Sequence, residues 1–196
     1  MTESGEQSTS HEKPTLKQAL LVRARDHVLE HGAAGLSLSQ LSREVGSSNR
    51  MLLYHFGSLE QLLNLIVDDV VASSGVINAV LAPLAVTDRG LVDRLCSCWD
   101  VLASDGLAGA RALFFAHFGT ALQRPDRNAA FIGMVADQWT DDLVEALRAA
   151  DADVSRTSAD AVVALWRGLQ MSLISGVDPD VVAATHRRAV AVLIDC

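Results

Sequence analysis

Cysteine is scarce in this chain, and the two cysteines that lie close together are badly placed for joint chemistry. The sequence contains three cysteines, which do not make the disulfide framework of a small secreted protein. Cys96 and Cys98 are two positions apart, so on a helix they point to different sides, which disfavours metal chelation and cross-linking. We interpret them as small residues of the core or of a pocket in a reduced protein.

The sequence also lacks the short motifs of common enzyme classes. It contains no Gly-rich phosphate loop and no nucleophile elbow. It has no strand-like alternation between hairpin turns and no internal repeat of about 20 to 50 residues. Apolar residues instead recur with helical spacing. The expected fold class is all-α, with C-terminal helices over residues 88–104, 108–123, 126–150, 157–176 and 179–194.

Long hydrophobic runs are missing as well. The uncharged stretch 70–86 is interrupted by serine, glycine, asparagine and proline, and it is shorter than the roughly 20 apolar residues of a membrane span. We interpret it as the end of a connecting helix followed by a loop. Residues 1–14 are polar and carry no secretion signal, and residues 1–12 are expected to form a disordered arm. A cytoplasmic protein without a membrane partner is therefore expected.

The net charge of −8 opposes a nucleic-acid partner until it is divided along the chain. Residues 13–58 hold six Lys/Arg against three Asp/Glu, whereas residues 59–196 hold ten against eighteen. This asymmetry fits a weakly basic head attached to an acidic body. The apolar content of 49% is high for a soluble monomer, which suggests a dimer, an internal pocket or both.

The most informative segment is 36–63, which predicts two short helices that meet at a glycine. Ser37 precedes a helical run with core-facing Leu38, Leu41 and Val45, and its hydroxyl can accept a free backbone N–H at the helix start. Gly46 follows the last of these, where a helix end favours a residue without Cβ. This arrangement is typical of a helix-turn-helix, a DNA-binding unit.

The second helix of this motif has one packing face and one free face. Ser47 or Ser48 can cap it, and Leu52 and Phe56 fall four apart on one stripe. The other face carries Arg50, Met51 and Tyr54. The Gly-Ser pair at 57–58 ends this helix, and a third helix is expected to begin at residue 59 and join the head to the body.

With these residues in view, segment 15–66 resembles the TetR family of transcriptional regulators. The resemblance rests on His31-Gly32, on Leu36-Ser37-Leu38, on Val45-Gly46 and on the run from Tyr54 to Glu60. It implies a three-helix DNA-binding head over 13–58 and a helical ligand-binding and dimerisation body over 59–196. Two positions depart from the family, because Leu53 replaces a tyrosine and Leu59 a lysine that hold DNA phosphates. We expect this loss to weaken backbone anchoring without changing base recognition.

The expected DNA contacts lie on and around the second motif helix. Asn49 suits adenine, Arg50 suits guanine, and Met51 can meet a thymine methyl group. Side chains placed to hold backbone phosphates or the helix start are Ser37, Ser39, Ser47, Ser48, Tyr54 and His55. A symmetric dimer of such heads predicts a palindromic operator on double-stranded DNA.

Small residues recur every fourth position in helix 157–176, which would let another helix approach closely. Ordinary packing within the chain explains the pattern nearly as well. The resemblance implies a homodimer through the last two long helices, here taken as 126–150 and 157–176. The interface residues expected on this basis are Trp139, Leu143, Ala164, Leu165, Gly168, Leu169 and Ser172.

Aromatic residues gather in the body, where they suggest either a filled core or an apolar ligand pocket. The expected lining comprises Trp99, Phe114, His117, Phe118, Met134 and Gln138. Asp137 or Asp141 would balance the charge of a cationic ligand. We therefore predict a repressor that a small, largely apolar effector releases from its operator, with no cofactor and no enzymatic activity.

Two other functions stay open at this point. The segment from His27 to His31 fits the H-x-x-E-H pattern of zinc metalloenzymes, with two histidines on one helical face and Glu30 beside them. No downstream cluster nominates a third zinc ligand, and Gly32 ends that helix. The other alternative is a helical adaptor whose helix-turn-helix contacts protein instead of DNA.

Overall fold

The computed structural model describes residues 15–33, 35–71 and 74–194, so the arm expected over residues 1–12 lies outside the described residues. Within those ranges the chain contains helices and no strand, which confirms the all-α prediction. The α-helices are α1 (Leu16–His31), α2 (Leu38–Glu44), α3 (Asn49–Phe56), α4 (Leu59–Val71), α5 (Ser74–Leu81), α6 (Leu91–Ala103), α7 (Ala108–Gln123), α8 (Ala129–Ala149), α9 (Arg156–Ile174) and α10 (Pro179–Ile194). Short 3-10 helices cover Ala82–Ala85, Asp105–Leu107 and Pro125–Arg127.

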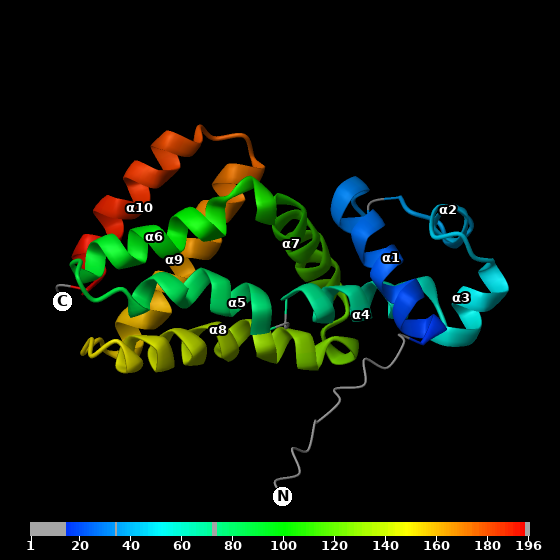
Figure 1. The fold of residues 1–196 in the computed structure, drawn as a ribbon, viewed down its shortest axis with the longest axis horizontal. Helices are drawn as coiled ribbons and strands as arrows, with labels where there is room; N and C mark the ends of the chain where they lie inside the picture. Colours follow the sequence, from blue (N-terminus) through cyan, green and yellow to red (C-terminus); the bar gives the residue numbers. More distant parts are fainter. Residues whose placement is uncertain (1–14, 34, 72–73, 195–196) are drawn as a thin grey trace, which may run out of the picture.

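Helices α1 to α3 form a head at one end of the elongated molecule, and α4 connects it to the body (Figure 1). The hydroxyl groups of Ser37 and Ser48 accept backbone N–H groups at the starts of α2 and α3, as their positions predict. Gly46 and Gly57 have φ values of 63° and 77°, a left-handed conformation that favours glycine. The starts of α2 and α3 therefore follow the local signals in the sequence.

The segment after α4 differs from the prediction. We expected a loop before residue 86, but residues 74–81 form α5 and residues 82–85 form a 3-10 helix. Ile77, Val80 and Leu81 are buried in the body core, so tertiary packing stabilises this helix. The stretch Leu59–Ala85 is long and apolar enough to cross a membrane, by length and composition only, which is weak evidence for a membrane span. Of its most apolar part, 43% is buried within the protein, and the core helix of a soluble protein meets the same criteria.

Two apolar clusters hold the molecule together. One fills the body between α5, α6, α8, α9 and α10, and includes Trp99, Leu143 and Trp166. The other joins the head to the body, since Leu20 and Leu52 of the head share it with Leu113 of α7. The head is thus packed directly against the body in addition to its covalent link through α4.

Candidate nucleic-acid interface and interior cavity

Helix α3 has the two faces that the sequence predicts. Leu52 and Phe56 are 1% and 5% exposed and pack in the head core. On the opposite face Arg50 is exposed, and Tyr54 is 79% exposed. Among the described residues Arg50 forms no hydrogen bond or ion pair, so its guanidinium group is free to contact a partner. This face presents long polar side chains on a short helix whose other face is anchored.

Asn49, the expected adenine contact, is engaged within the head. Its Oδ1 accepts a 2.7 Å hydrogen bond from the Ser42 hydroxyl, and its Nδ2 donates a 2.8 Å hydrogen bond to the Ser39 hydroxyl. Both polar atoms that would pair with an adenine edge are therefore used. Asn49 and Ser39 link the start of α3 to α2 and fix the angle between the two helices, a role that the sequence analysis did not anticipate.

The remaining residues of the expected interface differ in their access. Ser37 and Ser48 are exposed and cap their helices, while Ser47 and Met51 are half-buried. His55 is half-buried too, and its ring packs edge-on against Tyr54 with centroids 5.0 Å apart.

The orientation of the His55 ring opposes its expected role as a phosphate ligand. Its Nε2 is buried and has no hydrogen-bond partner within the part of the chain that the structure describes. That nitrogen therefore cannot reach a phosphate without rotation of the ring.

The two departures from the TetR pattern occupy different environments. Leu53 is 46% exposed beside Tyr54, so an apolar side chain stands on the free face of α3. Leu59 begins α4 and is half-buried against the head core. Neither can hold a phosphate by hydrogen bonding or charge, so Arg50 and Tyr54 are the remaining candidates on α3 for that contact.

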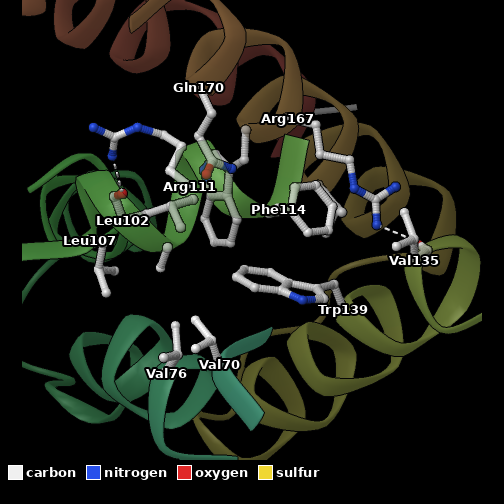
Figure 2. A pocket seen from close by; sticks show the side chains of 13 residues that line it. Val70, Val76, Leu102, Leu107, Arg111, Phe114, Val135, Trp139, Arg167 and Gln170 are labelled. Atoms are coloured by element: carbon white, nitrogen blue, oxygen red, sulfur yellow. Dashed lines mark hydrogen bonds between the residues drawn. The ribbon is translucent and has the colours of Figure 1, made fainter. Parts of the chain in front are cut away.

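The body contains a cavity of about 50 Å³ bounded by α4 to α9 (Figure 2). Its apolar walls include Val70 of α4, Val76 of α5, Phe114 of α7, Trp139 of α8 and Trp166 of α9. Ligand pockets commonly measure about 300 to 1,000 Å³, so side chains nearly fill this one in the present conformation. A drug-sized molecule can enter only after the aromatic walls move.

Of the residues expected to line a ligand pocket, Phe114 lines this cavity. Trp99 does not, because it is 2% exposed and stacks on His186 in the body core with ring centroids 5.2 Å apart. Phe118 and Met134 pack against the core shared with the head. His117 packs its ring edge against Phe131 at 4.5 Å, where burial lowers its pKa. Gln138 is exposed.

The polar lining of the cavity was missed in the sequence analysis. Figure 2 shows Arg111 and Arg167 at opposite ends of the cavity and Gln170 between them. One Nη of Arg111 donates a 3.1 Å hydrogen bond to the Leu102 carbonyl, and Arg167 donates to the Val135 carbonyl. Burial lowers the pKa of both guanidinium groups. Isolated arginines in amphipathic helices give no signal in the sequence that they converge on one cavity.

The carboxylates expected to face a cationic ligand lie elsewhere. Asp137 and Asp141 are exposed and do not line the cavity. Asp141 forms an ion pair with Arg156 at the start of α9. No described residue that lines the cavity carries a negative charge.

The cysteines match their expected structural role. Cys96 and Cys98 are buried in the body core, and burial raises the pKa of both thiols, that of Cys98 to about 12. Both groups are therefore protonated at neutral pH, which makes them poor nucleophiles and poor metal ligands.

The two histidines of the H-x-x-E-H segment stack on each other. The rings of His27 and His31 are 4.6 Å apart and nearly parallel, and His31 Nδ1 lies 3.2 Å from the His27 carbonyl oxygen. Within the described ranges no group of three or more His, Cys, Asp or Glu side chains is arranged to hold a metal ion. The geometry thus gives no support to the zinc-enzyme alternative.

The residues expected at a dimer interface fall into two groups. Leu143 is fully buried, Leu169 is 8% exposed and Trp139 lines the cavity, so these three serve the interior of the chain. Leu165 and Ser172 are half-buried, while Ala164 and Gly168 are exposed on α9. Trp139 and Leu143 were the two interface residues expected on α8, and both lie toward the interior of the chain instead.

Comparison with solved structures shows where this architecture occurs. The multidrug binding protein EbrR, solved with imidazole, is 24% identical, with a TM-score of 0.68 over 92% of this chain and 96% of its own. Salmonella enterica GusR is 21% identical, with a TM-score of 0.65 over 92% and 95%. A Rhodococcus sp. protein described as a TetR-family transcriptional regulator is 17% identical, with a TM-score of 0.61 over 91% and 96%.

No model of a protein family and no curated protein matches the chain. The structural similarity nevertheless extends over the head, the connecting helix and the body together, since it covers more than nine tenths of the sequence. The chain therefore has the fold of the TetR-family transcriptional regulators.

Proposed function

We propose that this protein is a DNA-binding transcriptional regulator, a homodimeric repressor that a small, largely apolar ligand releases from a palindromic operator. The observation that carries the proposal is the free face of α3, where Arg50 and Tyr54 are exposed on a helix held firmly by α2. The shared fold supports it, because the similar structures include proteins described as transcriptional regulators. The proposed regulator acts in the cytoplasm and needs no catalytic step.

In the proposed complex α3 enters the major groove. Arg50 lies in its first turn, and a guanidinium group without an intramolecular partner can bind the O6 and N7 atoms of guanine. Asn49 contributes by positioning α3, because its amide already bonds Ser39 and Ser42. Tyr54 and the exposed serine hydroxyls hold backbone phosphates.

The proposed dimer interface lies on α9 and α10 instead of α8 and α9. Four exposed apolar residues support this choice: Met171 and Ile174 on α9, and Val181 and Val192 on α10, which are 57%, 49%, 56% and 62% exposed. Ala164 and Gly168 leave a shallow surface on α9 that another helix can approach. Two heads related by a two-fold axis would bind half-sites about one helical turn of DNA apart, or a multiple of that distance.

Ligand response is proposed to pass through α4. Val70 near the end of α4 lines the cavity, while Leu62 and Ile66 of the same helix are fully buried in the core shared with the head. A ligand that enlarges the cavity would therefore shift α4 and with it the spacing of the two heads. The ligand must bind the non-DNA-binding arrangement more tightly for this shift to occur. EbrR, which is structurally similar, was solved with proflavin.

The test starts with selection of genomic double-stranded fragments on the purified protein at low salt. Fluorescence anisotropy then compares the wild type with Arg50→Ala on the selected fragment. We expect the variant to lose about 1 to 3 kcal/mol of binding free energy, the value of a bidentate base contact. The control is Arg148→Ala, which removes an exposed positive charge at the far end of α8 and should leave affinity nearly unchanged.

Titrations at several salt concentrations separate base contact from phosphate contact. If Arg50 neutralises a phosphate, the slope of log affinity against log salt decreases by about 0.9 in the variant. Equal effects of Arg50→Ala and Arg148→Ala would contradict the assigned interface. Failure to retain any double-stranded fragment would contradict the regulator and favour the protein-binding adaptor.

A further inference from the structure

We infer that the interior cavity binds an amphipathic anion, whose carboxylate or similar acidic head meets Arg111 or Arg167 and whose apolar part fills the space toward α4 and α5. This inference rests on the proposed regulatory function, in which the cavity is the ligand site. From the sequence we expected a largely apolar ligand, with Asp137 or Asp141 as the counter-charge if that ligand were cationic.

The charge of the lining gives the first argument. Arg111 and Arg167 are the charged residues among the described side chains that line the cavity, and both are positive. Each donates a hydrogen bond to a neutral backbone carbonyl, and neither forms an ion pair with a carboxylate of the described chain. A guanidinium group has five N–H donors, so both arginines retain donors for an anion.

The burial of these arginines gives the second argument. Both side chains are half-buried, and loss of hydration lowers the pKa of each guanidinium group. Asp105 acts on the charge of Arg111 and Asp160 on that of Arg167, but neither aspartate forms an ion pair with its arginine. An acidic ligand group in the cavity would therefore stabilise these partly dehydrated charges further. A cationic ligand would instead add a like charge to a cavity with low polarity.

The distribution of polar groups gives the third argument. In Figure 2, Arg111, Gln170 and Arg167 lie along the side of the cavity formed by α7 and α9. Val70 and Val76 lie on the opposite side, with the Trp139 ring between the two. A molecule with one acidic end and one apolar end fits this division. Trp139, Trp166 and Phe114 can contact an aromatic or aliphatic group.

An open cleft beside the cavity offers the competing site for a cation. It lies between α1, α4 and the start of α7 and includes Glu30 and Asp105. Its Asp26 and Asp69 are already paired with Arg25 at 2.9 and 3.1 Å. All of these carboxylates are exposed, so solvent screens them. Arg111 acts electrostatically on Asp105 of this cleft, so a cation bound there would bind more tightly once Arg111 loses its charge. That change is opposite to the one expected for an anion in the cavity.

The test uses three probes that share one apolar part: 4-phenylbutyrate, 4-phenylbutan-1-ol and 4-phenylbutylammonium. Binding to the full chain without DNA is measured by calorimetry and by tryptophan fluorescence, since Trp139 and Trp166 line the cavity. We expect the anion to bind at least about tenfold more tightly than the alcohol and the cation, the value of a charge-assisted hydrogen bond.

Two variants assign the effect to the cavity. In Arg111→Met and Arg167→Met, an unbranched apolar side chain replaces the aliphatic part of the arginine, and the positive charge is removed. In at least one of them we expect anion affinity to fall about tenfold toward that of the alcohol, while alcohol affinity does not fall. Arg148→Met, outside the cavity, is the control, and circular dichroism checks the fold of each variant.

The inference is overturned if the ammonium probe binds as tightly as the carboxylate, or if none of the three probes binds. It is also overturned if both folded variants bind the anion as the wild type does. Should a variant fail to fold, the ranking of the three probes on the wild type decides. Retention of DNA fragments is measured separately, so failure of the anion site does not imply failure of the proposed regulator.

Discussion

At the scale of single residues, His186 combines a structural role with a strong dependence on its environment. It is fully buried between Trp99 and Trp166, and its Nε2 accepts a 2.9 Å hydrogen bond from the Trp166 indole N–H. The proton of the neutral ring must therefore lie on Nδ1, which is buried and has no partner among the described residues. Burial, together with the nearby charge of Arg187, lowers the pKa of His186 to about 4.

This pKa predicts a loss of stability in mild acid. A histidine in the unfolded chain has a pKa of about 6.5, so the unfolded state binds the proton first as the pH falls. The contribution of neutral His186 to the free energy of unfolding is present in full above about pH 6.5 and is lost as the pH falls to 4. The loss amounts to about 2 kcal/mol at pH 5 and about 3 kcal/mol in total. Urea unfolding at pH 7.5 and pH 5 measures this change.

The matched variant for this prediction is His186→Gln. A glutamine carbonyl can accept the Trp166 N–H but does not titrate, so the variant should lose about 2 kcal/mol less than the wild type between these pH values. Parallel pH profiles of the two proteins would show that another group causes the acid sensitivity.

At the scale of helices, the contact between α1 and α7 depends on Gly109 in the first turn of α7. A Cβ atom at this position would overlap the backbone carbonyl of Leu29 in α1, and a backbone group cannot rotate away. Gly109→Ala should therefore separate the two helices and lower the free energy of unfolding by about 1 to 3 kcal/mol, the usual cost of overpacking. Thermal and urea unfolding give the measurement.

Gly119 in the same helix provides the control. An added Cβ there meets no atom within 4 Å, so Gly119→Ala should stabilise α7 by about 0.5 to 1 kcal/mol through helix propensity alone. If both alanine variants change the free energy of unfolding in the same direction and by the same amount, the predicted overlap between residue 109 and Leu29 is contradicted.

The helix boundaries also show which signals are local. The bounds of α7 agree with the predicted range 108–123, and α10 begins at residue 179 as predicted. Pro125 follows the end of α7 and Pro179 opens α10. Helix α5 was not predicted, since its short apolar sequence has no charge pattern and its serine, glycine and asparagine residues favoured a loop. Its formation depends on burial of Ile77 and Val80 against other helices.

At the scale of the whole molecule, the position of the dimer interface can be tested with two glycines. Gly168 on α9 and Gly133 on α8 are both exposed, and a Cβ at either position meets no atom within 4 Å. Arginine should therefore be tolerated at both sites within one chain. We expect Gly168→Arg to produce monomers in sedimentation velocity experiments, because it places a charge in an apolar interface, while Gly133→Arg stays dimeric.

The opposite result would place the interface on α8 without Gly168. It would contradict both the proposed α9 and α10 interface and the interface expected from the sequence, which includes Gly168. Dimers in both variants, or a wild type that is already monomeric, would contradict the proposed arrangement of α9 and α10. DNA binding by each variant adds a second measurement, since a monomer with one head loses most of its affinity for a two-fold operator.

The sequence by itself determined the helical class, the head and the two faces of α3. These features depend on caps, glycines and apolar spacing among residues a few positions apart, as with Ser48 and Gly46. Tertiary structure decided that Asn49 is tied to Ser39 and that Trp99 belongs to the core. It also brought Arg111 and Arg167 to one cavity. These outcomes depend on contacts between residues distant in the chain, and a one-dimensional pattern of apolar and polar residues contains no measure of such distances.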